Sequence, residues 1–156
     1  MVPIRPLAGE SEARRCAEMM SSTEPWITLR RNFDESLAIV NDPTSEVYLA
    51  VEDARVLGFI ILMMRAVFSG YIRTVCVDDA ARGGGLGRQL VQFAEERIFR
   101  ETPNVFLCVS SFNPRARQLY ERLGYEFIGE LKDYLILGAS EFLMRKTIGP
   151  IREFRR

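Results

Sequence analysis

A cluster of glycines in the middle of the chain constrains the fold more than any other feature. Four of the eleven glycines fall within the five positions 83–87. The segment 71–77 before them has the apolar and β-branched content of a buried strand. After them, Leu86, Leu90 and Ile98 recur at helical spacing, which predicts a helix of about four turns. The glycines therefore occupy a junction between a strand and a helix.

Such a junction is a ready anion site, because bare backbone N–H groups and the positive end of the helix dipole face the same space. We expect the loop to hold a pyrophosphate, whose oxygens reach backbone donors only where no Cβ intervenes. A flexible turn without a ligand is the alternative. The flanking Arg82 and Arg88 weigh against it.

The segments before the loop predict two helices and several strands. Apolar periodicity, prolines and polar breaks place them at 3–7 (edge strand), 11–20 and about 29–40 (helices), and 47–52 and 56–64 (a hairpin). Ser11 is the expected cap of the first helix. After the loop, Asn113 and Pro114 predict a helix start, and Gly124 predicts its end.

The remaining segments complete one domain. Apolar content predicts strands at 105–109, 125–131 and 141–148, and the connection 132–140 is unusually apolar for a loop. The strands predicted between residues 47 and 77 are separated by short turns, as in antiparallel hairpins. A strand–helix–strand crossover, which joins parallel strands, spans 71–109. We therefore expect residues 1–156 to form a single α/β domain with a mixed sheet.

The composition limits the classes of partner that we expect. Lys plus Arg equals Asp plus Glu at 21 each, so no strong net field favours nucleic acid or an anionic membrane, and a small ligand is the better expectation. No apolar run approaches a membrane span, and no signal core follows the N-terminus, so we expect a cytoplasmic protein.

Histidine is absent, which removes Ser-His-Asp and Cys-His nucleophile systems and the commonest metal ligand. Cys16, Cys76 and Cys108 are odd in number and widely spaced, as expected of reduced thiols rather than of disulfides or a zinc site. We expect no metal. Chemistry must then use carboxylates, Tyr, Cys, Lys, Arg or the backbone.

Two familiar phosphate loops do not match the glycine cluster. A Walker A loop requires Lys and then Ser or Thr after its last glycine, whereas Arg88-Gln89 follows here. A Rossmann loop requires G-x-G-x-x-G, and the third position is Arg88 or Leu90, depending on the starting glycine.

A third class does match. Arg82-Gly-Gly-Gly-Leu-Gly87 resembles the R/Q-x-x-G-x-G/A signature of the GNAT superfamily of acetyl-CoA-dependent N-acetyltransferases. Asn113-Pro-Arg-Ala-Arg-Gln-Leu-Tyr-Glu-Arg-Leu-Gly-Tyr125 is similar to its second signature, N-x-x-A-x-x-L-Y-x-x-x-G-F. The close resemblance covers about residues 71–129. It implies a GNAT-like fold, in which helices flank a mostly antiparallel sheet whose central parallel strand pair splays apart.

The resemblance also implies acetyl-CoA as cosubstrate and no metal. Its pantetheine arm would lie between the splayed strands along the backbone of Val75, Cys76 and Val77, and Asn113 would reach the arm. The pyrophosphate would be held by Arg82, Gly83, Gly84, Gly85, Leu86, Gly87 and Arg88. The arginines of the following helix are candidates for the 3′-phosphate or are simply solvated, namely Arg115, Arg117 and Arg122.

Amide formation requires a base for an amine with a pKa of about 10.4 and an acid for a thiol leaving group with a pKa of about 8.5. The resemblance implies Tyr120 as the general acid, which also contacts the cofactor, and a strand N–H near Val77 as the oxyanion donor. Many relatives carry a glutamate on a splayed strand, but neither strand has one here. Glu24 is our candidate base, and a water relay is the alternative.

The acceptor is expected to be a primary amine of a small molecule or peptide. By analogy of position, Trp26, Phe33 and Tyr134 of the apolar segment 134–137 would line its side of the site. Core or dimer packing is their alternative role, and the segment 134–137 or the strand with Phe142 is a candidate homodimer interface.

Two other functions stay open. One is a non-catalytic acyl-CoA-binding module, since a base is missing from the splayed strands, and the other is a nucleotide-binding protein of another type. A covalent route through Cys76 or Cys108 is the weaker mechanism, because both lie within apolar strands as expected of small buried hydrophobes.

Overall fold

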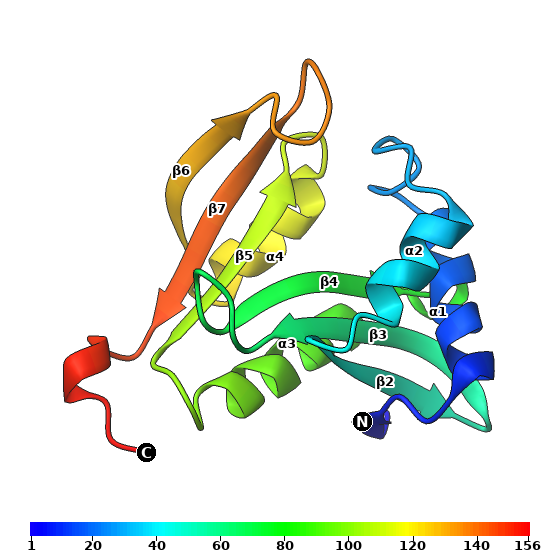
Figure 1. Cartoon of the computed structure of the whole chain (residues 1–156), viewed down its shortest axis with the longest axis horizontal. Helices are drawn as coiled ribbons and strands as arrows, with labels where there is room; N and C mark the ends of the chain where they lie inside the picture. The colour runs from blue at the N-terminus through cyan, green and yellow to red at the C-terminus, as the bar shows by residue number, and fades with distance from the viewer.

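A single seven-stranded sheet runs through the whole chain (Figure 1), and the computed structural model describes all 156 residues. The spatial order is β1-β2-β3-β4-β5-β7-β6, and only β4 and β5 are parallel. This confirms the expected fold class. The strands are β1 Ile4–Pro6, β2 Glu46–Glu52, β3 Arg55–Met63, β4 Tyr71–Val77, β5 Asn104–Ser110, β6 Glu126–Lys132 and β7 Ser140–Thr147.

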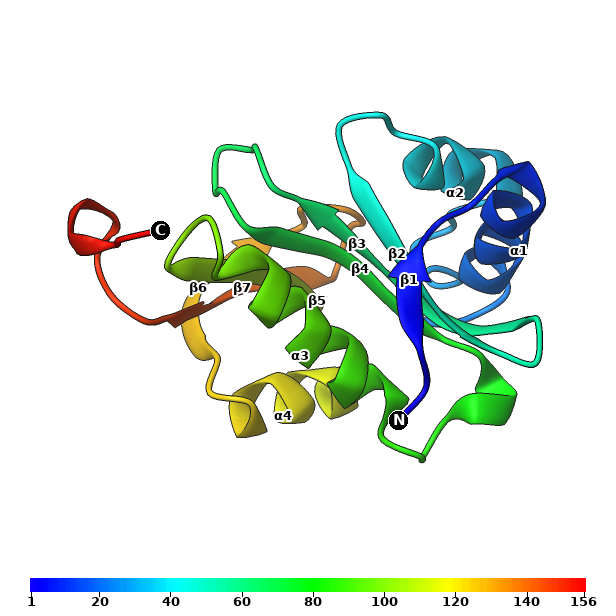
Figure 2. The same cartoon turned by 90° about the horizontal axis from the view of Figure 1, so that it is seen from below.

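Helices cover both faces of the sheet (Figure 2). They are α1 Glu10–Ser21, α2 Phe33–Val40, α3 Leu86–Ile98 and α4 Pro114–Arg122, with short 3-10 turns at Asp79–Ala81 and Ile151–Glu153. One buried cluster joins α1 and α2 to the sheet through Met20, Val40 and Phe59. A second joins α3 and α4 to the opposite face through Leu90, Leu107 and Tyr120.

The parallel pair separates almost immediately. Only Tyr71 with Phe106 and Ile72 with Leu107 are in register, and the two strands then diverge (Figure 1). Each strand keeps its antiparallel neighbour, β3 for β4 and β7 for β5. The inner edges of β4 and β5 therefore lack strand partners beyond Ile72, and their backbone groups face the space between them.

The helix starts differ from two predictions. Ser11 does not cap α1, which begins at Glu10 after Gly9. The Glu12 carboxylate accepts the N–H of Ala8, which precedes the helix, at 2.8 Å and pairs with Arg5, and no side chain caps the helix itself. The predicted start at Asn113 is confirmed, since its side chain accepts the N–H of Ala116.

The second helix begins at Phe33 rather than near Leu29. Arg30 has a φ of 56°, which no α-helix contains. Asn32 and Glu35 then form a reciprocal capping box at 2.9 and 3.0 Å. The segment before Phe33 is consequently a turn, and it borders the space between β4 and β5. None of the helices has the length and apolar content to cross a membrane.

Candidate active site

A cavity of about 900 Å³ opens where β4 and β5 separate. Its walls come from the glycine loop, α4, β4, β5, the start of β7 and the turn before α2. These segments lie far apart in the sequence, and the splay brings them around one space. A smaller cavity of about 390 Å³, lined by residues such as Asn41 and Tyr48, lies away from both signature segments.

The glycine loop presents unused donors to this cavity. Gly83 and Gly85 have φ values of 84° and 83°, a left-handed conformation that favours glycine, and no atom lies within 4 Å of the place that a Cβ would occupy. The backbone N–H groups of 83–88 have no acceptor among the turns and caps of the structure, and no side chain caps α3. The loop therefore fits a pyrophosphate, because the donors that such a group requires are uncovered and at a helix N-terminus.

The residues of β4 divide between the two sides of the sheet. Val75 and Val77 line the cavity. Cys76 points the other way, is 2% exposed, and its Sγ lies 3.9 Å from Oγ1 of Thr23. Burial raises the pKa of Cys76 to about 12, so its thiol stays protonated and is a poor nucleophile. Only the backbone of Cys76 is available to a ligand between the strands.

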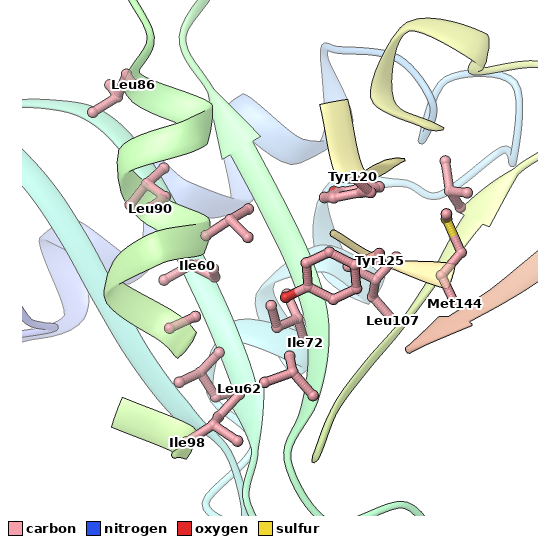
Figure 3. Close-up of a cluster of buried hydrophobic side chains, with 14 of the residues drawn as sticks. Ile60, Leu62, Ile72, Leu86, Leu90, Ile98, Leu107, Tyr120, Tyr125 and Met144 are labelled. Atoms are coloured by element: carbon pink, nitrogen blue, oxygen red, sulfur yellow. The ribbon is translucent and has the colours of Figure 1, made fainter. Parts of the chain in front are cut away.

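Tyr120 of α4 is buried and lines the cavity. Its ring packs edge-on against that of Tyr125, with the ring centroids 5.8 Å apart. Figure 3 shows both tyrosines in the same buried cluster as Ile72 and Leu107. Burial raises the pKa of Tyr120 to about 12. The phenol is therefore protonated at neutral pH and able to donate a proton or a hydrogen bond.

Most of the other expected site residues also line this cavity. They are Glu24, Trp26, Arg82, Gly83, Gly85, Leu86, Gly87, Arg88, Asn113, Arg115, Arg122 and Tyr134. Gly84, Arg117 and Phe33 do not. Phe33 instead packs under the guanidinium of Arg14 at 5.0 Å, and Arg117 lies over the ring of Phe142 at 4.7 Å.

Glu24 lies at the rim. Its side chain is exposed, and one carboxylate oxygen accepts the N–H of Thr28 at 3.2 Å. It is therefore a solvated carboxylate at the entrance of the cavity.

Sequence reasoning missed the buried carboxylate of the site, Glu141. Glu141 is the second residue of β7 and lies directly opposite Ser110 of β5, so both side chains lie on one face of the sheet. Glu141 is 7% exposed and lines the cavity. Burial raises its pKa, while the Ser110 hydroxyl and the charge of Arg31 act in the opposite direction. This carboxylate comes from the strand paired with β5 rather than from either splayed strand.

Tyr71 and Cys108 lie between Glu141 and the point where the strands separate. Cys108 and Ser110 share a face of β5, and Tyr71 is in register with Phe106 of that face. Burial raises the pKa of both Tyr71 and Cys108, each of which lines the cavity. This end of the cavity is thus a sheltered polar surface whose phenol and thiol stay protonated.

Two arginines complete this end. Arg73 forms an ion pair with Asp42 at 3.1 Å, and Arg31 lines the cavity half-buried. Burial lowers the pKa of Arg31, and the charge of Arg73 lowers it further. No group of His, Cys, Asp and Glu side chains is arranged to hold a metal ion.

Comparison with known proteins matches residues 13–125 to the acetyltransferase (GNAT) family. A protein of Mycobacterium leprae, uncharacterized protein ML0378, is 30% identical over 145 residues, which cover 87% of this chain but only 38% of that protein. The N-alpha-acetyltransferase RimI of Mycobacterium tuberculosis is 28% identical over 147 residues, covering 89% of each chain.

A Bacillus subtilis protein, S-(2-succino)cysteine N-acetyltransferase, is 30% identical over 145 residues, covering 83% of this chain and 88% of its own. The solved structure of Arabidopsis thaliana NAA60 in complex with acetyl-CoA superposes with a TM-score of 0.77 at 18% identity, covering 95% of this chain and 99% of that one. This chain therefore belongs to the GNAT family of acetyltransferases, acyltransferases that use acetyl-CoA and need no metal.

Proposed function

We propose that this protein transfers the acetyl group of acetyl-CoA directly to a primary amine of a small molecule or peptide. The observation that carries the proposal is the cavity between β4 and β5, which has uncovered backbone donors at one end and a buried carboxylate at the other. The family match and the relatives named for N-acetylation support the reaction class.

The cofactor end binds through the backbone. The N–H groups from Gly83 to Arg88 hold the pyrophosphate, with the side chains of Arg82 and Arg88 adding positive charge. The unpaired edge of β4 at Val75 to Val77 holds the pantetheine arm by sheet-like hydrogen bonds. Asn113, at the start of α4, lines the same passage.

Proton transfers are divided between two side chains. The neutral amine attacks the thioester carbon, the new C–N bond forms, and the C–S bond breaks. Glu141 takes a proton from the nitrogen, and Tyr120 gives one to the departing sulfur. Both groups then exchange protons with solvent, so the reaction balances without a further reactant. A backbone N–H near Val77 stabilises the oxyanion.

Glu141 is a better base than Glu24. Burial raises the pKa of Glu141, which brings a carboxylate closer to the basicity that an amine proton requires. Glu24 is exposed at the rim and is retained as a second candidate, since it lines the same cavity.

Release of free coenzyme A thiol, measured across a panel of amines and peptides with a control lacking acceptor, tests the proposal. Acceptor-dependent release is the expected result. Tight acetyl-CoA binding without release for any acceptor would favour a non-catalytic acyl-CoA-binding module instead.

A further inference from the structure

The acceptor end of the cavity contains a cationic side chain without a partner. Arg31 lies between the turn at 25–30 and the cap of α2 and forms neither an ion pair nor a side-chain hydrogen bond, although Glu35 and Glu141 lie within electrostatic range. Its guanidinium is half-buried, so water covers it only in part. A sheltered guanidinium that no carboxylate contacts is costly, so an anion bound beside Arg31 would be stabilised.

The nearby acidic groups do not fill this role. Asp42 is occupied by Arg73 and by the N–H and hydroxyl of Thr44 at 2.9 and 2.6 Å. Glu35 accepts the N–H of Asn32 in the capping box. Glu141 interacts with Arg31 only through space and not through a hydrogen bond. The five donors of the guanidinium therefore remain free for a ligand in the cavity.

Arg31 and Glu141 thus present opposite charges to one cavity without neutralising each other directly. We propose that the acceptor is an amine that also bears a carboxylate, of the amino acid class, with its nitrogen at Glu141 and its carboxylate in a fork-like contact with Arg31. A guanidinium suits this task because its planar donors match the two carboxylate oxygens. This inference rests on the proposed acetyl transfer.

The acceptor end carries charges of both signs. Arg31 and Arg73 line it together with the carboxylates of Glu24, Asp42 and Glu141, and Asp42 is already paired with Arg73. A zwitterionic acceptor matches this arrangement, whereas a polyamine or aminoglycoside would leave Arg31 without an anion. The apolar walls provided by Trp26, Leu29 and Leu135 suit the side chain of an amino acid.

The test compares acceptors that share a carbon frame and differ only at the carboxylate. L-phenylalanine, L-phenylalaninamide and 2-phenylethylamine form one such set, L-leucine with its amide and amine a second, and spermidine represents polycations. We expect kcat/KM from thiol release to favour the free acid by on the order of 10²-fold, because a site built for a polar group rejects analogues that lack it. Equal or better use of the amide and amine would overturn the inference.

Variants of Arg31 test whether this side chain causes the preference for the free acid. Arg31→Gln should raise KM for the amino acid at least about tenfold, abolish the preference over the amide, and leave KM for acetyl-CoA unchanged. Arg31→Lys should restore part of the preference. Arg30→Gln is the matched control, because Arg30 is exposed and does not line the cavity. An Arg31→Gln variant that retains the wild-type preference would overturn the inference.

Saturation-transfer NMR of the amino acid with the coenzyme A-loaded protein separates this inference from the proposed function. Binding that requires Arg31, without thiol release for any acceptor, would support an amino acid site at Arg31 and overturn acetyl transfer. Thiol release only with amines that lack a carboxylate would overturn the inference alone. Absence of both binding and release would overturn both.

Discussion

Tyr120 is the residue whose environment most directly indicates a chemical role. Burial keeps its phenol protonated, and the side chain lines the cavity. Tyr120→Phe should lower kcat by about 10²-fold or more and leave KM for acetyl-CoA within about twofold, since the hydroxyl acts on the leaving group. Tyr125→Phe is the matched control, because its buried hydroxyl has no hydrogen-bond partner and does not line the cavity. Unchanged turnover in Tyr120→Phe would remove Tyr120 from the mechanism.

The base role proposed for Glu141 predicts how activity depends on pH. A base acts when deprotonated, so activity rises as pH passes upward through its pKa, and burial raises that pKa above the ordinary 4.5. We expect Glu141→Gln to lower kcat/KM by about 10²-fold and to remove the corresponding acidic limb of the pH–rate profile.

The control is Glu24→Gln, whose carboxylate lies at the exposed rim. The profile of this variant should match that of the wild type. A shifted limb in Glu24→Gln together with an intact limb in Glu141→Gln would reverse the two assignments.

Among the elements, the glycine loop and the start of α3 form the unit that we propose to bind the pyrophosphate. Gly85→Val introduces a branched side chain where φ is 83° and where the pyrophosphate would contact the backbone. We expect affinity for acetyl-CoA to fall at least about tenfold, because hydrogen bonds to a charged group contribute about 1.5–3 kcal/mol each. Isothermal titration calorimetry measures this directly.

Gly138→Val provides a matched control. Gly138 has the same φ of 83° and equally open surroundings, but it lies in the connection between β6 and β7. Both variants carry similar backbone strain, so a comparable loss of affinity in both would refute the loop assignment. Melting temperatures show whether each variant is folded.

Element boundaries were predictable wherever a local signal determined them. Asn113 with Pro114 determined the start of α4, and the apolar spacing determined α3. Ser11 has the residue type of a cap, but α1 begins at Glu10 after Gly9 and has no side-chain cap. The apolar spacing extends to Leu29, whereas α2 begins at Phe33, because Asn32 and Glu35 form a capping box whose residues are visible in the sequence.

At the scale of the whole molecule, acetyl-CoA bound between β4 and β5 should stabilise the folded state, because the site exists only when the two strands are in place. A ligand that binds only the folded state at 100 times its Kd adds about 2.7 kcal/mol. For a domain of this size that corresponds to a rise in Tm of roughly 5–10 °C. Differential scanning fluorimetry with acetyl-CoA, ATP and NAD at equal concentration checks it. Equal protection by ATP or NAD would favour a different kind of nucleotide-binding protein.

From the sequence alone, local patterns were enough to predict most helices and strands, the glycine loop between β4 and α3, and the position of Tyr120 on α4, because each depends on periodicity, turn residues or spacing within a short segment. The opposite end of the cavity depends on the tertiary structure. Arg31, Tyr71 and Glu141 come from distant segments, and they meet because β4 and β5 diverge while β7 pairs with β5. Strand order and long-range register depend on packing between segments rather than on local pattern, so a buried carboxylate beside a splayed strand was not visible before folding.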